Sequence, residues 1–317
     1  MRALASVVPR ATLVEAHSAA ELRAAAAAQP DSIAVIDDQG LRALESGPAC
    51  PVLAITDELL PGVVSALGTH AWLDHVIAST ALADPIAAEH VANVLAALSK
   101  RGAPRLLDWV EKAKSVTGRR VRLVQASRRA ERLDKLTQFF EENSVSGRTV
   151  QVLRDAAEEL LTNAFYDAPV AARIVSEPIS RTRDVCLPED HACDLAYGCR
   201  EDFAFVRVRD PFGSLPRARL VEVLSRCARR DMQVEVDESM GGAGLGLWRI
   251  FSGATAVAIS VINGRSTEIL VGMWKRVGAG PRPFCYDLFF EERGSARAWT
   301  LDSTVTTAVT LVDKTQS

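Results

Sequence analysis

A glycine run is the first stretch of this sequence whose residues could do chemistry. It reads GGAGLGLWRI, over residues 241–250, and it opens a predicted helix. Glycine in a helix costs roughly 1 kcal/mol relative to alanine, so it is expected where the backbone must approach something closely or adopt a positive φ. Such a turn can direct bare N–H groups and a helix N-terminus at phosphate oxygens.

The run matches neither of two common phosphate-binding motifs. For G-x-G-x-x-G, starting at Gly242 or Gly244, the third glycine position holds Leu247 or Arg249. A P-loop fails too, because Leu and Trp follow Gly246 where Lys and Ser or Thr are needed. An NAD-binding enzyme is therefore disfavoured, and G-x-G-L-G-L remains as the motif.

A predicted helix over residues 149–167 is the second such stretch. Asp155, Glu159 and Asn163 lie four residues apart and form one stripe. That stripe is either a solvated face or a group of side chains that share a site. The opposite side is apolar at helical spacing and marks a buried face, made of Leu153, Ala156, Ala157, Leu160, Leu161, Ala164 and Phe165.

Length and composition limit the classes of function. The 317 residues suffice for two ordinary domains, and 48% hydrophobic with 24% charged residues is typical of a soluble globular protein. The net charge of -3 supplies no bulk electrostatic reason to bind nucleic acid or an anionic membrane. No segment reaches the ~18 apolar residues that span a bilayer, and the N-terminus has no uninterrupted apolar run, so we expect a cytoplasmic protein.

Six cysteines occur without any C-x-x-C pair, and we expect them to be reduced. Cys186, His191, Cys193 and Cys199 do cluster. Their spacings match no common zinc pattern and they alternate with apolar residues, which favours buried thiols over a zinc site.

Three short Val- and Ile-rich runs near the N-terminus predict buried parallel strands. Alanine-rich helical segments lie between and after them, one with Asp84 as predicted N-cap and Pro85 at its first position. This alternation indicates a doubly wound α/β domain with a parallel sheet. The strands are SIAVIDD (32–38), PVLAITD (51–57) and LDHVIAST (73–80).

Punctuation by Gly and Pro in SKRGAPR places the end of this first domain near residue 100. We therefore expect a domain over residues 1–100, a connecting helix and linker over 101–118, and a second domain over 119–280. Residues 281–317 form a C-terminal extension whose role the sequence does not reveal.

The first domain resembles a two-component receiver domain, in which Asp37 would stand at the phosphoacceptor position. A receiver also needs an acidic pair after its first strand to hold magnesium, yet no carboxylate precedes Glu15. Ser79 and Thr80 stand where its lysine is expected. We thus expect a degenerate, receiver-like domain that works by protein contact rather than by phosphorylation of Asp37.

The second domain shows strand and helix signals in a definite order. Ser146 is a plausible N-cap of the helix described above, and Pro169 is expected to end it. Asn263-Gly264, between two alternating strands, is the strongest short hairpin signal that a sequence carries. The other predicted elements are a strand at 119–127, a helix at 131–143 and a strand at 203–210.

Three motifs in this domain, taken in order, resemble the boxes of the GHKL ATPase superfamily, which includes histidine kinases, gyrase, Hsp90, MutL and anti-sigma-factor kinases. They are EELLTNAFYD (158–167) as the N box, DPFG (210–213) as the adenine-binding box and GGAGLGL (241–247) as the phosphate-binding box. Thr267 is a weaker fourth match. The resemblance implies a two-layer α/β sandwich, a mixed sheet with helices on one face, that binds Mg-ATP.

The resemblance also implies roles for particular residues. Asp210 would accept a hydrogen bond from the adenine amino group, Asn163 would bind Mg²⁺, and Glu159, with Glu158 as its neighbour, would be the general base. Three arginines of the lid would neutralise phosphates or simply form a solvated face: Arg226, Arg229 and Arg230. The implied cofactor-binding set is Asn163, Asp167, Asp210, Gly213, Gly242, Gly244, Leu245, Gly246, Leu247 and Thr267.

Some positions depart from the family pattern. Phe212 and Ser214 stand where a D-x-G-x-G box carries glycines, and the segment from Tyr166 to Ala168 replaces the His-Gly that usually follows the N box of anti-sigma-factor serine kinases, the closest group in layout. All histidines ahead of the N box fall in the receiver-like part, so an autophosphorylating histidine kinase is not expected.

Two functions follow from these motifs as expectations. One is a bacterial signalling enzyme, either an Mg-ATP-dependent ATPase or a serine/threonine kinase, that acts on a regulatory protein partner. The other is a non-catalytic ATP-sensing module that controls a partner through its lid. A homodimer is also compatible with the sequence.

Overall fold

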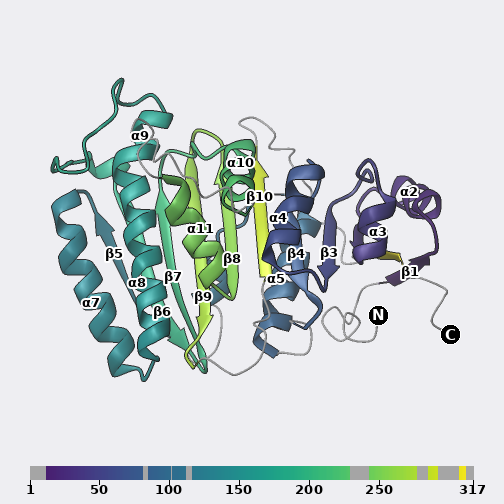
Figure 1. The fold of residues 1–317 in the computed structure, drawn as a ribbon, viewed down its shortest axis with the longest axis horizontal. Coiled ribbons are helices and arrows are strands. Elements are labelled where there is room, and N and C mark those ends of the chain that lie inside the picture. The colour runs from purple at the N-terminus through teal and green to yellow at the C-terminus, as the bar shows by residue number, and fades with distance from the viewer. Residues whose placement is uncertain are drawn as a thin grey trace. The chain divides into compact units, whose positions relative to one another are not determined.

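The computed structural model of the protein describes residues 12–80, 85–100, 102–111, 116–228, 243–276, 285–291 and 307–311. The chain forms two compact units (Figure 1). The first gathers Met1–Gly102, Pro283–Asp287 and Ala296–Ser317, and the second gathers Ala103–Arg282 and Leu288–Ser295. The segment expected as a C-terminal extension is thus divided between the two units, and the expected linker after residue 102 belongs to the second.

Parallel strands build the first unit, as the sequence predicts. Hydrogen bonding gives the strand order β1-β11-β2-β3-β4-β10, in which the first five strands run parallel and the start of β10 pairs antiparallel with β4. Its elements are β1 (Thr12–Ala16), α2 (Ala19–Ala28), β2 (Ile33–Ile36), α3 (Asp38–Ala43), β3 (Val52–Thr56), α4 (Leu60–Thr69), β4 (His75–Ala78), α5 (Pro85–Lys100), β11 (Thr307–Leu311) and the first three residues of β10 (Cys285–Glu291).

The strand β11 takes a position that no local pattern predicts. It lies between β1 and β2, with Thr307 opposite Thr12 on one side and Ala308 opposite Ile33 on the other. The sheet of the first unit therefore depends on a strand from the far end of the sequence.

Polar residues at the carboxyl ends of β2, β3 and β4 bond to the chain and to one another. The carboxylate of Asp37 accepts a hydrogen bond from the Gly40 N–H at 2.8 Å and caps α3. Asp38 accepts from the Thr56 hydroxyl and from the Asp57 N–H. The Asp57 carboxylate accepts from the hydroxyl of Ser79. The predicted N-cap of α5, residue 84, lies outside the described residues.

In the second unit, β5, β6, β7, β9 and β8 pair in this order, each antiparallel to the next. The predicted hairpin at Asn263-Gly264 is confirmed, and Gly264 adopts a φ of 68°. The strand β6 was not predicted, because its sequence was interpreted as a cysteine cluster. The bounds are β5 (Val116–Leu123), β6 (Cys193–Arg200), β7 (Phe203–Asp210), β8 (Ala256–Ile262) and β9 (Ser266–Trp274).

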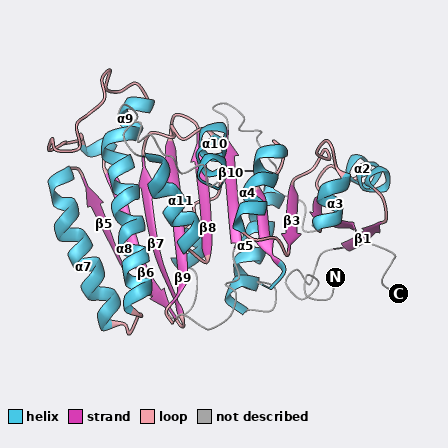
Figure 2. Ribbon diagram, in the orientation of Figure 1, coloured by secondary structure: helices cyan, strands magenta, loops and turns pink. Residues whose placement is uncertain are grey.

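Helices α7, α8 and α11 lie across one face of these strands (Figure 2). Ser146 caps α8 as predicted, by accepting from the Thr149 N–H. The predicted end at Pro169 is wrong: the helix continues through a π-helical turn into α9, whose first turn tolerates a proline. The helices are α6 (Leu107–Glu111), α7 (Arg129–Glu142), α8 (Gly147–Thr162), α9 (Ala168–Ala171), α10 (Arg217–Ala228) and α11 (Ala243–Gly253), with the π turn at Asn163–Asp167.

The α/β class is confirmed, but one helix lies outside the expected arrangement of helices on a single face. Phe139 and Phe140 of α7 pack edge-on against Tyr197, whereas α6 packs with Phe205 and Leu270 in a separate cluster. Successive strand residues point to opposite faces, so α6 covers the second face. None of the helices in the described ranges combines the length and the apolar character needed to cross a bilayer.

A buried ion pair fastens α6 there. The Arg207 Nε and Glu268 Oε1 atoms are 2.6 Å apart, and the Leu107 N–H donates to the same Glu268 oxygen at 2.9 Å. Both charged side chains are almost fully buried, and breaking such a pair by removing one partner is strongly destabilising.

Candidate functional site

A cavity of about 970 Å³ opens in the second unit, between the helical layer and the sheet. Its apolar wall comes from the sheet and from the helices α8 and α10, with side chains such as Val208, Ile269, Leu160, Leu220 and Val223. Five residues that were predicted from sequence to bind the cofactor also line it: Asn163, Asp167, Asp210, Leu247 and Thr267.

The π-helical turn positions Asn163 and Asp167. Both residues line the cavity, as does the largely buried Tyr166, while Ala164 and Phe165 between them are buried in the core. A π turn inserted in an α-helix is frequent at functional sites, since the wider turn changes which side chains share a face. Here it keeps two polar side chains of the N-box stretch directed to the same cavity.

Two buried oxygen atoms of this helix and its π turn have no hydrogen-bond partner among the residues that the structure describes: Oε1 of Glu159 and Oδ1 of Asn163. Leaving a buried acceptor unpaired costs about 1–3 kcal/mol, so these two oxygens are available to bind a donor or a cation. Asp155, the first residue of the predicted stripe, is exposed and accepts from Gln151 at 2.7 Å. The stripe therefore has a solvated end and a buried end, and only the buried end belongs to the site.

Gly246 is one position of the glycine run where the structure leaves no room for a side chain. A Cβ atom at this position would lie 1.9 Å from Cδ of Glu159, closer than any real contact. The group that packs against the backbone of Gly246 is therefore the Glu159 carboxylate of the neighbouring helix α8. Gly244 and Leu245 lie in the first turn of α11, and Gly242 falls outside the described residues.

Asp210 ends β7, and the sheet register places Thr267 of β9 directly opposite it. Asp210 is 8% exposed, and its Oδ1 accepts from the Phe212 N–H at 2.8 Å. Burial raises the pKa of this carboxyl to about 6, against the opposing effect of hydrogen bonds from Phe212, Gly213 and Thr267. Burial in the cavity disfavours the charged form of this carboxyl, and a ligand that donates a hydrogen bond to it would offset that desolvation.

Gly213 holds the turn after Asp210 against the predicted hairpin. Its φ is 60°, and a Cβ would lie 2.1 Å from the Ile262 carbonyl oxygen. The Gly264 N–H also donates to the Gly213 carbonyl at 3.1 Å. The positive φ and this close contact explain why residue 213 is a glycine, without reference to a ligand. Ser214 stands where the D-x-G-x-G pattern has its last glycine. It lines the cavity and donates to the Ala168 carbonyl at 3.1 Å.

Two carboxyls near Asn163 have perturbed acidity. Burial raises the pKa of Glu159, the positive charges of Arg181 and Arg249 lower it, and the negative charge of Asp167 raises it further. Burial also raises the pKa of Asp167, whose Oδ2 lies 3.5 Å from Nη2 of Arg181. Desolvation with specific charged partners, in a cavity, is characteristic of functional sites.

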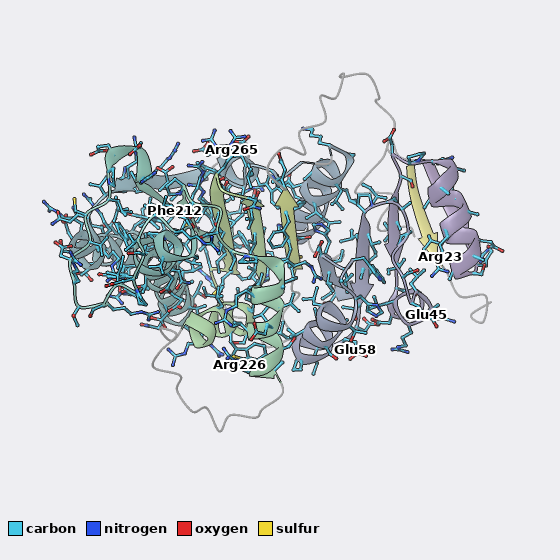
Figure 3. The ribbon with its side chains drawn as sticks, turned by 90° about the horizontal axis from the view of Figure 1, so that it is seen from above. Arg23, Glu45, Glu58, Phe212, Arg226 and Arg265 are labelled. Atoms are coloured by element: carbon cyan, nitrogen blue, oxygen red, sulfur yellow. The ribbon has the colours of Figure 1, made fainter. Side chains whose placement is uncertain are left out.

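Sequence reasoning missed Arg181, which lines the cavity from a loop without periodicity or motif. Of the three lid arginines, Arg226 is exposed at the end of α10 and is not among the residues that line the cavity (Figure 3). Residues 229 and 230 fall outside the described ranges.

The cysteine cluster does not form a metal centre in the described part of the chain, where no group of three or more metal-binding side chains comes together. Cys193 and Cys199 are buried in β6, and burial raises the pKa of both thiols.

Compared with protein-family models and with curated proteins, the sequence matches none.

Proposed function

We propose that the second unit binds Mg-ATP in the manner of GHKL ATPases, and that it uses ATP as an ATPase or as a serine/threonine kinase for a regulatory protein partner. The observation that carries the proposal is the single cavity shared by Asn163, Asp167, Asp210, Leu247 and Thr267, which come from distant parts of the sequence. Its volume of about 970 Å³ falls within the range of cofactor sites.

The adenine end of the ligand is assigned to Asp210. Its carboxylate is acceptor-only when ionised, so it can accept from an exocyclic amino group. Thr267, opposite in the sheet, adds a hydroxyl, and the apolar wall with Val208 and Ile269 suits an aromatic base.

The phosphate end is assigned to Asn163 and Glu159. The unpaired Oδ1 of Asn163 is the kind of hard oxygen ligand that Mg²⁺ takes, and this metal commonly keeps one or two protein ligands beside substrate phosphates. When bound, Mg-ATP would supply the transferable phosphoryl group. Glu159 would take the proton of the attacking hydroxyl on its unpaired Oε1, and its raised pKa strengthens it as a base.

The non-catalytic sensor is retained as a second candidate because of one contact. Gly246 packs closely on the Glu159 carboxylate, so a movement of α11 toward α8 would displace the side chain of the proposed base. A module in which nucleotide binding moves α11 could signal to a partner without turnover.

The first unit and the cellular setting complete the proposal. We propose that the first unit makes protein contacts, since Asp37 serves as a helix cap. A net charge of -3 supports protein partners over nucleic acid or membrane, and we propose that the protein works in the cytoplasm.

Calorimetric titration with ATP, with and without Mg²⁺, tests the proposal. Asn163→Ala should weaken the magnesium-dependent part of binding, whereas Asp155→Ala, on the exposed end of the same helix, should leave it unchanged. Glu159→Gln should keep Mg-ATP bound while turnover drops by roughly 10²-fold or more. A wild type that binds no ATP refutes the proposal, and binding without hydrolysis or transfer selects the sensor.

A further inference from the structure

The loop over residues 172–192, between α9 and β6, forms one wall of the cavity through Pro178, Ile179, Ser180 and Arg181. Its far end is fastened to the chain around the start of α7. The Ala126 N–H donates to the Val185 carbonyl at 2.8 Å, and the Leu187 N–H donates to the Val124 carbonyl at 2.7 Å.

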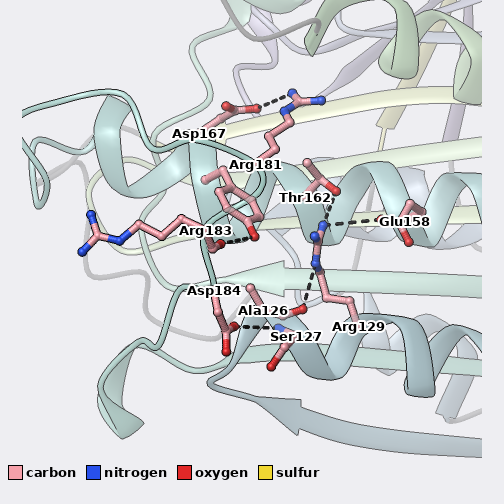
Figure 4. A network of polar contacts seen from close by, with 10 residues as sticks. Ala126, Ser127, Arg129, Glu158, Thr162, Asp167, Arg181, Arg183 and Asp184 are labelled. Carbon is pink, nitrogen blue, oxygen red and sulfur yellow. Dashed lines mark hydrogen bonds and ion pairs between the residues drawn. The ribbon is translucent and has the colours of Figure 1, made fainter.

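Side chains strengthen this attachment (Figure 4). The Asp184 carboxylate accepts from the Ser127 N–H at 2.9 Å and from the Gln125 side chain at 2.8 Å. The Tyr166 hydroxyl donates to the Arg183 carbonyl at 2.8 Å. Tyr166 belongs to the π turn that carries Asn163 and Asp167. A residue of the site therefore binds the loop at Arg183, two residues from Arg181.

The π turn is in turn held by Arg129. Its guanidinium lies 5.1 Å from the centroid of the Tyr166 ring, and it donates to the Thr162 hydroxyl and to the Ala126 carbonyl. Glu158 lies 3.5 Å away as its ion-pair partner. Arg129 thus joins the start of α7 to the end of α8, next to the two segments to which the loop is bound, residues 124–127 and the π turn.

The charges around the cavity are unbalanced for a polyphosphate ligand. Asp167 and Asp210 line it, with Glu159 adjacent, and the arginines among its described lining residues are Arg181 and Arg219. Arg249, outside the lining, acts on Glu159. Arg219 is paired with Glu222 of its own helix at 3.2 Å. Arg181 instead faces the carboxyls: its charge lowers the pKa of both Glu159 and Asp167.

The pair of Arg181 with Asp167 is weakly held. The Nη2 to Oδ2 distance is 3.5 Å, and the two side chains are 40% and 37% exposed. Ion pairs of this exposure contribute about 0–1 kcal/mol, so a stronger anion can displace the carboxylate.

We propose that Arg181 binds the terminal phosphates of the nucleotide, exchanging the Asp167 carboxylate for phosphate oxygens. The inference rests on the proposed function, because it names a further binding residue of the same site. A guanidinium matches phosphate with two parallel hydrogen bonds, and it offsets the repulsion between the phosphates and the carboxyls of the cavity. In the ligand-free protein Arg181 pairs with Asp167.

Nucleotide affinity tests this assignment through Arg181→Gln and a matched control, Arg183→Gln. The Arg183 side chain belongs to the same loop but points away from the network (Figure 4). We expect ATP to bind roughly tenfold or more weakly to Arg181→Gln, with adenosine affinity unchanged and the control like wild type. Equal ATP affinity in wild type and Arg181→Gln, with adenosine still bound, overturns the inference alone. Failure of the wild type to bind any of these ligands overturns the proposed function.

A measurement on the ligand-free protein tests whether Arg181 acts through its charge or only through the volume of its side chain in the cavity wall. In a carboxyl NMR titration, Arg181→Gln should raise the pKa of Asp167, while Arg181→Lys should keep most of the lowering and lose most of the ATP affinity, since an ammonium cannot make the paired hydrogen bonds. An Asp167 pKa that is the same in wild type and Arg181→Gln contradicts the inference.

Discussion

Replacing Asp210 by Asn should raise the stability of the ligand-free protein relative to wild type as the pH rises from 4 to 8, and it should weaken the binding of nucleotide. Burial raises the pKa of this carboxyl from 3.8 to about 6 in the folded protein. A raised folded-state pKa means that the folded protein binds the proton more tightly than the unfolded chain. The contribution of Asp210 to stability is therefore fully present below about pH 4 and is lost as the pH rises through about 6.

The size of the effect follows from the pKa difference. About two units at 1.36 kcal/mol per unit correspond to roughly 3 kcal/mol, of which about 2–3 kcal/mol falls between pH 4 and pH 8. Asn does not titrate, so the stability of Asp210→Asn minus that of wild type should grow by this amount across the range. The lost acceptor oxygen, which faces donors of the following turn and of Thr267, shifts the difference by a constant and leaves its pH dependence intact.

Urea unfolding at several pH values, followed by tryptophan fluorescence, measures this difference. Trp109, Trp248 and Trp274 report on the second unit. Asp155→Asn, at an exposed position, controls for the removal of one negative charge. ATP affinity of Asp210→Asn should fall by about 1–3 kcal/mol, because an amide N–H would face the adenine amino group. A pH-independent stability difference would refute the raised pKa, and unchanged ATP affinity in the folded variant would refute the role in binding.

Three further predictions concern packing and the first unit. Gly246→Ala should destabilise the wild type by about 1 kcal/mol more than it destabilises the Glu159→Ala variant, because its Cβ would lie 1.9 Å from Cδ of Glu159 and that side chain must move aside; additive effects in this double-mutant cycle would contradict the contact. Asp37→Ala should cost about 1 kcal/mol as a lost helix cap, and acetyl phosphate should leave the mass of the wild type unchanged, whereas a magnesium-dependent gain of one phosphoryl group would restore a receiver function. A chain truncated after Glu291 lacks β11 and should lose the fold of the first unit, as seen by hydrogen exchange of β1 and β2; protection equal to wild type would show that β11 is dispensable.

Local patterns in the sequence were enough to predict the elements that are stabilised locally. The Val- and Ile-rich runs became β2, β3 and β4, Ser146 caps its helix, and Asn263-Gly264 forms its hairpin. Periodicity, capping and turn chemistry act within a few residues, so they can be recognised without knowing the rest of the fold. The same holds for the motif residues, whose spacing pointed to one site before any geometry was known.

The tertiary structure alone decided which distant segments meet. The position of β11 between β1 and β2 and the contact of Gly246 with Glu159 join residues that no periodicity relates. Arg181 lines the cavity from a loop that is bound to Tyr166 of the π turn and to Ser127 ahead of α7. The pKa of Asp210 depends on burial by the whole unit. Desolvation and side-chain packing are sums over neighbours from every part of the chain, and for that reason the sequence by itself did not determine them.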